Sequence, residues 1–511
     1  MEIKKIGLKH QLSYGSVNLL GSGSLAMAQT WLLIFYTTVV GIEAWKAALI
    51  FTIATNLDVV TNPIMGYISD NFYRYKIGRR FGRRRFFLLI GIPLIVLYPL
   101  VYIPLPGGIP TDAKWIFYLV TYILFECVYT MIMIPYEALA PEMTDNFADR
   151  ATLTGTKAIF GKLANFLSQI IPAFFFWQLG ENNEWAFALT GISFGIIMMV
   201  SVFALYRNSW ERSPEEVHEP QAGSMFENLK KLFIDVFSTL RVKAFRTQLG
   251  MYLFGFGAEW LWASTFTFFV VYILGIAKSG VALFNSWSSI LQIVSTFIVM
   301  FWVAKKGYRR PMQASLVIVI LSVLAYCFVY LTGLTSVGTV GVYAIVMGIT
   351  IFFGIGTGGV YYVPWSTYTF MADIDEALTG RHRAGVYAGA MTMVGKLVRA
   401  WLVMGLGIAL SAFGFNAATE TQPQSALNAI IGVAFVVCIM ALIGVFFAQK
   451  MKLDNNIHQQ LLFEINRRKE GGLAEDVTPE HRKVVEDLTG WKYEDCFGNN
   501  NVGYKSHEDQ D

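Results

Sequence analysis

Long apolar runs recur along almost the whole chain, and each is about twenty residues long. A helix of that length crosses the hydrocarbon core of a bilayer, which is about 30 Å thick. Charged residues make up 15% of the sequence, against roughly 25% in a soluble domain. We therefore expect an all-α integral membrane protein with about twelve transmembrane helices. The expected spans lie near residues 16–41, 45–70, 84–105, 115–138, 151–178, 184–206, 245–275, 280–304, 311–332, 339–370, 384–414 and 425–449.

Lys and Arg are distributed unevenly between the two sets of short connections. Cytoplasmic loops retain an excess of these residues, so the richer set is predicted to be cytoplasmic, together with both termini. The formal net charge of +4 mostly reflects this bias and gives no reason to expect a nucleic-acid partner. The rich set holds Arg74–Arg85, Lys305, Lys306, Arg309, Arg310, Arg381 and Arg383, whereas the other holds little more than Lys46, Lys114 and Lys278.

A polar stretch divides the apolar runs into two groups of six. The predicted organisation is a six-helix half over 1–206, a cytoplasmic loop over 207–243, a second six-helix half over 244–449 and a cytoplasmic tail over 450–511. Thr478, Pro479 and Gly490 are typical N-cap, first-turn and C-terminal residues, so a short tail helix is expected near 479–489. Two such halves are typical of transporters that bind substrate near the bilayer midplane.

Asp58 lies inside the second apolar run, one helical turn before Asn62. An ionisable group within a transmembrane helix is costly unless it faces a cavity and finds a partner. Asp58 is therefore predicted to belong to an ion or substrate site. Glu259, in the seventh apolar run, is an ionisable group in the same situation, so it too is expected to have a functional reason for its place there.

Several separated segments resemble, in order and spacing, the glycoside-pentoside-hexuronide:cation symporters of the major facilitator superfamily, the family of the melibiose permease. The resemblance covers nearly all of the membrane portion and implies the major facilitator fold. The matching segments are Leu12–Gly15, Phe35–Gly41, Asp58–Gly66 with the basic loop after it, Ile134–Leu139, Thr144-Asp145, Asp149-Arg150, Pro364-Trp365, Asp373–Glu376, Thr379–Arg381 and Thr392–Lys396.

The resemblance implies a cation site made by the second, fourth and eleventh spans. The family has two second-span carboxylates with a polar residue between them. Asp58 takes the first carboxylate position and Thr61 the polar position, while Thr130 matches the fourth-span threonine and Lys396 the eleventh-span lysine. Asn62 stands where the family often has a second aspartate. An amide keeps an oxygen that can bind sodium but removes one charge, so the candidate sodium ligands are Asp58, Asn62 and Thr130.

The loss of that carboxylate leaves the co-transported ion open between Na⁺ and H⁺. Proton coupling through Asp58, sodium coupling of weaker affinity and uncoupled diffusion are all consistent with the sequence. Glu126, four residues before Thr130 on the same helical face, is a hypothetical replacement for the missing charge, although it could instead line the substrate path. Asp58 and Lys396 could also form only a structural ion pair.

The sugar-binding acids of the melibiose permease are absent here, because Ser22 and Met133 stand at the first-span and fourth-span positions. Basic residues are frequent instead, and they suit an anionic substrate through charge-assisted hydrogen bonds. A uronic-acid-containing sugar is therefore favoured over a neutral glycoside, unless these groups snorkel or pair with internal acids. The basic residues are Lys157, Lys162, Lys396 and Arg399.

The residues expected to contact substrate combine these charges with aromatic side chains beside polar groups. For any single aromatic residue, core packing is the alternative. The full set is Ser22, Gln29, Trp31, Tyr129, Met133, Glu137, Lys157, Glu259, Trp262, Trp365, Thr392 and Arg399.

Charged residues at the cytoplasmic helix ends are expected to form ion pairs that close an inner gate and break as the site opens. Fixing the topology or binding anionic lipid is the alternative, and it is favoured for Arg79–Arg85. The expected gate residues are Asp70, Arg74, Asp149, Arg150, Asp373, Glu376, Arg381 and Arg383.

The predicted function is secondary active import of a glycoside or hexuronide by cation-coupled symport in a bacterial cytoplasmic membrane. No enzyme motif and no cofactor other than a co-transported Na⁺ or H⁺ is expected, and the partners are a small sugar and the bilayer around a monomer. Neutral-glycoside transport, proton-coupled or uncoupled, and lysolipid transport are alternatives within the class. A receptor or scaffold acting through the tail is the alternative outside it.

Overall fold

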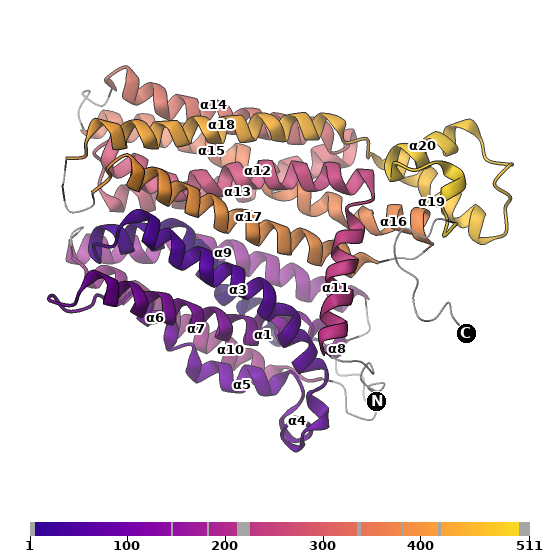
Figure 1. The fold of residues 1–511 in the computed structure, drawn as a ribbon, viewed down its shortest axis with the longest axis horizontal. Coiled ribbons are helices and arrows are strands. Elements are labelled where there is room, and N and C mark those ends of the chain that lie inside the picture. The colour runs from indigo at the N-terminus through magenta and orange to yellow at the C-terminus, as the bar shows by residue number, and fades with distance from the viewer. Residues whose placement is uncertain are drawn as a thin grey trace. The chain divides into compact units, whose positions relative to one another are not determined.

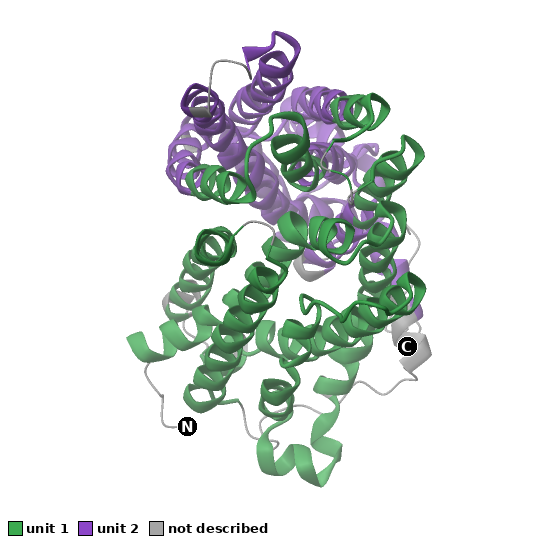
Figure 2. Cartoon of the chain, turned by 90° about the vertical axis from the view of Figure 1, so that its left-hand side faces the viewer, with its two compact units in different colours: residues 1–225, 261–289, 400–433 green, residues 226–260, 290–399, 434–511 purple. Residues whose placement is uncertain are grey.

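The computed structural model describes residues 6–144, 147–180, 183–211, 225–334, 339–380, 383–416, 419 and 421–499. Within these ranges the regular structure is entirely helical (Figure 1). Two compact units are present, coloured separately in Figure 2. Unit 1 consists of residues 1–225, 261–289 and 400–433, and unit 2 of residues 226–260, 290–399 and 434–511.

The first part of the chain forms the helices that make up most of unit 1. Within it, α2 packs on α9 and α3 on α7. The elements are α1 (Leu8–Ser16), α2 (Asn18–Met27), the π-helices η1 (Ala28–Leu32) and η2 (Phe35–Val39), α3 (Ala44–Asp70), the 3₁₀ turn η3 (Phe72–Arg74), α4 (Lys76–Phe81), α5 (Arg85–Leu94), α6 (Leu97–Leu100), α7 (Thr111–Glu137), α8 (Ala140–Met143), α9 (Phe147–Leu179) and α10 (Trp185–Asn208).

The second part contributes mainly to unit 2, where α14 packs closely on α15. Four of its long helices, α12, α13, α17 and α18, have one end in each unit. The elements are α11 (Met225–Thr239), α12 (Lys243–Phe268), the π-helix η4 (Phe269–Ile273), α13 (Lys278–Lys306), α14 (Arg309–Leu331), α15 (Thr339–Thr367), η6 (Tyr368–Phe370), α16 (Met371–Thr379), α17 (Ala384–Ala412), α18 (Gln424–Lys450), α19 (Asn455–Lys469), α20 (Pro479–Thr489) and η7 (Tyr493–Asp495).

Ten helical runs of the described chain are long and apolar enough to cross a membrane. The two other expected spans are present as broken helices. The first is divided into α1, α2 and two π-helical turns, and the third into α5 and α6. Pro93 lies within α5, and a proline cannot supply the backbone hydrogen bond that continues a helix. The predicted all-α membrane fold is confirmed.

Unit 1 brings together helix ends that belong to different six-helix groups. The positive-inside rule predicts that these ends face the outside. Small and polar residues make the contacts. Thr52 Oγ1 donates to the Ala400 carbonyl over 3.0 Å, the Trp45 amide to Ser411 Oγ over 3.0 Å, Thr267 Oγ1 to the Thr30 carbonyl over 3.2 Å and Asn285 Nδ2 to Gln169 Oε1 over 3.3 Å.

The tail folds as a small helical module in unit 2, and it packs on α16. Thr478 Oγ1 accepts from the His481 amide at the start of α20, and Gly490 ends the helix with φ +81°. The amides of Phe497 and Gly498 donate to the carbonyls of Ala377 and Leu378 over 2.8 and 3.2 Å. The last described residues of the tail are therefore bonded to the final turn of α16.

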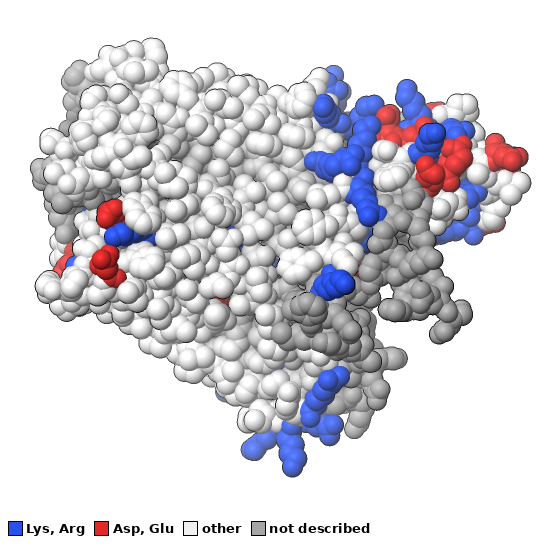
Figure 3. Space-filling view, in the orientation of Figure 1, with Lys and Arg blue, Asp and Glu red and all other residues white. Residues whose placement is uncertain are grey.

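Charged side chains avoid the long flanks of the helices. In Figure 3 those flanks are white, and Lys and Arg gather over helix ends and over the tail module. Because a charged group on a lipid-facing flank would lose its hydration, this distribution is the one expected for helices embedded in a bilayer.

Candidate functional site

A buried carboxylate centre joins α3 and α7 inside unit 1. Asp58 and Asn62 are one turn apart on α3, and Asn62 Nδ2 lies 3.4 Å from Asp58 Oδ2. Thr130, on α7, hydrogen-bonds with Asp58 Oδ1 and lies 3.2 Å from Asn62 Oδ1. Asp58 and Thr130 are 3% and 2% exposed. The structure thus brings together three of the residues predicted for cation binding.

The donors of this centre are carboxylate, amide and hydroxyl oxygens, which are the ligands that hard cations prefer. Thr61 is oriented differently, because its Oγ1 donates to the Asp58 backbone carbonyl over 3.2 Å. Among the described residues, no group of three or more His, Cys, Asp or Glu could hold a metal ion. Asp58 is the one acid among the three residues of this centre.

The other two residues predicted for coupling lie on α7 and α17. Glu126 is half-buried on α7, and both it and Asp58 act electrostatically on the neighbouring Cys127. Lys396 is half-buried on the part of α17 that belongs to unit 2.

The predicted substrate residues of the first and fifth spans are linked through Asn18. Asn18 Nδ2 donates to the Lys157 carbonyl over 2.9 Å, and Ser22 Oγ donates to Asn18 Oδ1 over 3.3 Å. The Lys157 ammonium forms an ion pair with Glu137 while both side chains stay partly exposed. Glycines permit this close approach, since a Cβ at Gly161 would lie 2.6 Å from Asn18 Nδ2.

Other predicted substrate residues of unit 1 differ in how they are placed. Trp31 and Trp262 are fully buried, and Trp31 Nε1 donates to the Ser168 carbonyl over 3.0 Å. Met133 is buried against Gly21, and Tyr129 is half-buried on α7. Gln29, in η1, has a buried Nε2 with no hydrogen-bond partner in the described structure. Such an amide is suited to meeting a ligand oxygen.

The predicted substrate residues of unit 2 lie on α12, α15 and α17. Glu259 is buried and accepts a hydrogen bond from the Tyr361 hydroxyl over 3.1 Å. Arg399 is 4% exposed. Trp365 and Thr392 are exposed, with Thr392 Oγ1 bonded to the Ala388 carbonyl of its own helix.

A buried charged cluster ties the basic loop of unit 1 to α8 and to the end of α10. Arg83 and Arg84 both pair with Glu142, and the Arg84 amide donates to Glu211 Oε2 over 3.0 Å. Burial raises the pKa of Glu211 above its usual range, and burial also raises the pKa of Tyr73 to about 12. This part of the basic loop therefore has a structural partner beyond its role in topology.

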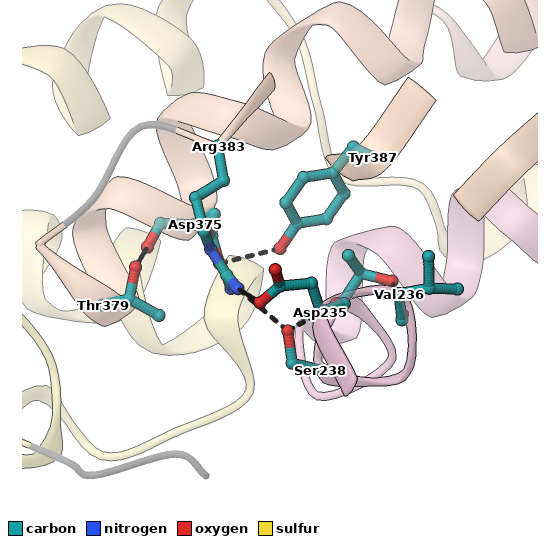
Figure 4. Close-up of polar contacts among 8 residues, drawn as sticks. Asp235, Val236, Ser238, Asp375, Thr379, Arg383 and Tyr387 are labelled. Carbon is teal, nitrogen blue, oxygen red and sulfur yellow. Dashed lines mark hydrogen bonds and ion pairs between the residues drawn. The ribbon is translucent and has the colours of Figure 1, made fainter. Parts of the chain in front are cut away.

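The corresponding network of unit 2 is centred on Arg383 (Figure 4). Its Nε and Nη2 each lie 2.8 Å from the carboxylate oxygens of Asp375, and its Nη1 donates to Ser238 Oγ over 2.9 Å. The Tyr387 hydroxyl donates to the same carboxylate over 2.8 Å. Desolvation opposes the charge of Arg383, but Asp375 outweighs it and raises the pKa of the guanidinium.

The remaining gate residues have varied surroundings. Asp373 lies 2.8 Å from His458 Nε2 and Glu376 lies 2.5 Å from Lys469 Nζ, so two predicted gate acids contact the tail. Thr144 Oγ1 donates to Asp149 over 3.4 Å, and Arg74 is exposed. Arg381 and the side chains of Asp70 and Arg150 lie outside what the structure describes.

Sequence reasoning missed Asp375, Glu142 and Tyr361 as site residues. Asp375 has a local signal, because it falls on the same helical face as the buried Met371, Ile374 and Leu378, and an acid on an apolar face needs a partner. Glu142 and Tyr361 have no such signal, because their partners come from distant parts of the chain.

Comparison with known proteins agrees with this architecture. A sequence profile described as MFS/sugar transport protein matches residues 13–455. The isoprimeverose transporter of Lactiplantibacillus pentosus is 26% identical, covering 89% of this chain and 90% of the relative. The glucuronide carrier protein homolog of Escherichia coli (strain K12) is 23% identical, with coverages of 89% and 95%.

Solved structures support the fold independently. A D-xylose-proton symporter aligns with a TM-score of 0.59 at 13% identity, covering 87% of this chain and 97% of that protein. The family resemblance seen in the sequence motifs is thereby confirmed. The chain belongs to the MFS/sugar transport protein family and is a multi-pass membrane transporter rather than an enzyme.

Proposed function

We propose that this transporter imports a glycoside, preferably one that contains a uronic acid, by cation-coupled symport with alternating access. The centre of Asp58, Asn62 and Thr130 carries the argument for coupling. Asp58 is nearly fully buried in a membrane helix, where an ionised carboxylate needs compensation. The oxygen atoms of Asn62 and Thr130 lie beside it and are groups that can bind a cation together with it. Thr61, Glu126 and Lys396 complete the proposed coupling set.

The argument for a uronic acid rests on the ion pair between Lys157 and Glu137. Both side chains are partly exposed, so a substrate carboxylate can replace Glu137 as the partner of Lys157. A neutral glycoside would leave that pair intact and place only hydroxyl groups against it. The relative named as a glucuronide carrier homolog supports the same substrate class.

The other proposed substrate contacts supply hydrogen bonds, stacking surfaces and positive charge. Gln29 offers an unused amide donor, and the exposed ring of Trp365 offers a face for a sugar ring. The remaining members of the proposed site are Ser22, Trp31, Tyr129, Met133, Trp262, Thr392 and Arg399. Glu259, which is buried against Tyr361, is not among them. We further propose a monomer in a bacterial cytoplasmic membrane with both termini in the cytoplasm.

Uptake into proteoliposomes tests this proposal directly. Three labelled substrates are compared, an aryl glucuronide, the matching aryl glucoside and a lysolipid, each with and without a sodium or proton gradient. We expect the glucuronide to accumulate fastest and only with a gradient. Equal rates for glucuronide and glucoside would remove the uronic-acid preference, and flux of the lysolipid alone would contradict a sugar carrier. Flux of none of the three would favour a receptor acting through the tail.

A matched pair of variants locates the specificity. Lys157→Gln should lower glucuronide uptake by roughly tenfold while changing glucoside uptake less, since a charge-assisted hydrogen bond contributes about 1.5 to 3 kcal/mol. Lys483→Gln, at an exposed position of the tail, is the control and should change neither rate.

A further inference from the structure

Glu259 is a second buried acid within a membrane span, and the coupling centre of unit 1 does not contain it. It lies near the middle of the span Lys243–Ile273 and is 8% exposed. Its Oε2 accepts the hydroxyl of Tyr361, which comes from α15, over 3.1 Å. All the contacts described next lie within unit 2.

Charged and titratable groups of α12, α15 and α17 are linked to Glu259 through Tyr361. Tyr361 approaches from α15 and experiences the charges of both Glu259 and Arg399. Arg399 is buried on α17 and also acts on Tyr252 of α12. The four groups therefore form one electrostatic cluster of an acid, a guanidinium and two phenols.

Side chains of three helices pack together at this cluster. A Cβ at Gly395 of α17 would lie 2.4 Å from the Tyr252 hydroxyl of α12, so this glycine leaves room for the tyrosine side chain. The Phe256 ring of α12 lies 4.7 Å, between centroids, from the ring of Tyr361 of α15 and 5.3 Å from that of Trp260. Displacements of α15 or α17 would thus change the partners of Glu259.

We propose that Glu259 is a proton-binding site that couples proton movement to substrate movement, and this rests on the symport function proposed above. With Tyr361 and Arg399 in place, the carboxylate is stabilised in its ionised form by a hydrogen bond and a positive charge. When α15 or α17 moves away, the ionised form loses both in an apolar environment, and the carboxylate takes up one proton. The return movement releases that proton on the other side, giving one proton per transport cycle.

A proton site at Glu259 would supply a titratable carboxylate in place of the one that is missing at Asn62. The centre of unit 1 has one carboxylate, whereas Glu259 supplies a second titratable group on the other six-helix half. The proton and the sugar can then occupy different sites and be coupled through helix movement, as a population shift between two states requires.

The test separates binding and translocation from coupling, using the full-length protein in proteoliposomes. Glu259→Gln cannot exchange a proton but keeps the size and the hydrogen-bonding capacity of the side chain. Sugar counterflow, which needs no net proton movement, should stay within about twofold of wild type. Accumulation driven by a pH gradient should fall to the equilibrium level, and the rise of uptake with external acidity should disappear. Glu475→Gln, at an exposed position of the tail, should leave both assays unchanged.

Other outcomes have distinct meanings. The proton site would be overturned if Glu259→Gln still accumulated sugar against a gradient. It would also be overturned if wild type accumulated sugar with a sodium gradient but not with a proton gradient. Glu259→Gln could instead lose both counterflow and accumulation. If Glu259→Asp, which keeps the acid, also loses both, then Glu259 is a structural or substrate residue and not a proton site. Absence of counterflow in wild type would instead contradict the sugar-transport proposal itself.

Tyr361→Phe tests the positioning of the acid. Removing the hydroxyl takes away one stabiliser of the ionised carboxylate, so the pH profile of uptake should move to higher pH while counterflow persists. A purely structural tyrosine would lower both activities without moving the profile.

Discussion

Arg383 holds the fully buried carboxylate of Asp375 through two parallel hydrogen bonds of 2.8 Å. The same guanidinium lies 3.7 Å from Asp235 and bonds Ser238, both on α11 (Figure 4). One arginine therefore connects α16, the helix after the tenth span, with α11, the helix of the central loop, and both belong to unit 2.

Arg383→Leu should destabilise unit 2 by roughly 3 kcal/mol, because it leaves Asp375 buried without its main counter-charge. Arg383→Lys should be intermediate, since an ammonium cannot form the two parallel bonds. Thermal unfolding in detergent can be followed with a thiol-reactive dye, because Cys327, Cys438 and Cys496 are buried until the protein unfolds.

The control for this prediction is Arg309→Leu at an exposed helix end, which should change the unfolding temperature little. The double variant Arg383→Leu with Asp375→Asn should recover part of the loss, because it removes the unpaired charge. If Arg383→Leu is no less stable than the Arg309 control, the network contributes little to stability.

The tail module depends on Glu464, whose side chain is fully buried among Arg467, Tyr493 and His481. Burial alone would raise the pKa of Glu464, but the bonds from Arg467 and Tyr493 outweigh it and hold the pKa below its usual range. A carboxyl whose folded pKa is depressed stabilises the fold above its unfolded pKa, about 4.3 for Glu. That contribution is lost as the pH falls through the folded pKa.

Glu464→Gln should therefore weaken the tail by roughly 1.5 to 3 kcal/mol near pH 7. The difference from wild type should shrink as the pH falls below about 4.3 and vanish below the depressed pKa of the folded protein. Hydrogen exchange of α19 and α20, compared between the two proteins at the same pH, measures it. Glu470→Gln, exposed at the end of α19, is the control. A difference that persists unchanged at low pH would show that the ionised carboxylate is not the cause.

Restoring the missing carboxylate is expected to strengthen sodium dependence. In Asn62→Asp, a second negative charge would join Asp58 beside Thr130. A charge about 4 Å from a cation contributes about 1 kcal/mol even at the dielectric constant of bulk water. The sodium concentration for half-maximal uptake should fall about fivefold or more.

Asn56→Asp provides the matched control on the same helix, because the Asn56 amide bonds only to the Thr52 carbonyl of its own helix in the described contacts, over 2.8 Å. A gain of sodium dependence in both variants would point to a general effect of negative charge in α3. No gain in either would argue against sodium at this centre.

The membrane spans were predictable because apolar length alone determines whether a helix crosses lipid. The breaks in the first span were not predictable, since the π-helical turns at Ala28–Leu32 and Phe35–Val39 carry no proline or glycine that signals them. The ends of α20 coincide with Thr478 and Gly490 because capping is a local property of the sequence. The docking of the tail on α16 depends on contacts between residues far apart in the chain, such as Asp373 and His458, which are 85 positions apart. The sequence has no periodic signal for such contacts.

In the candidate site, too, local relationships were predictable from the sequence and contacts between distant helices were not. The pairing of Asp58 with Asn62 follows from helical spacing, and Thr130 was placed beside them by family resemblance. Lys157 was expected to be available to substrate, whereas the structure pairs it with Glu137. The partners of Glu259 and Arg383 come from other helices, and a single sequence cannot specify such tertiary contacts.

Gly407 marks a close contact between α17 and α3 within unit 1. It lies at helix ends that the positive-inside rule predicts to face the outside, called the outer ends below. A Cβ at this position would lie 2.4 Å from the Ala48 Cβ and 2.6 Å from the Ala44 carbonyl oxygen, whereas a Cβ at Gly405 would meet open space. Gly407→Ala should therefore push the outer ends apart at a cost of about 1 to 3 kcal/mol, a bias of about five- to 150-fold against the packed arrangement.

A cysteine at Ser411 can report this change, because its hydroxyl accepts from the Trp45 amide in the packed arrangement. In a Cys127→Ser background, which removes the exposed native thiol of the described residues, Ser411→Cys should react several-fold faster with a membrane-impermeant maleimide when Gly407 is alanine. Gly405→Ala should leave the rate unchanged, because it adds a methyl group where there is room. Equal labelling in both backgrounds would mean that α17 absorbs the added methyl without separating from α3, and that the outer ends are not held together by this contact.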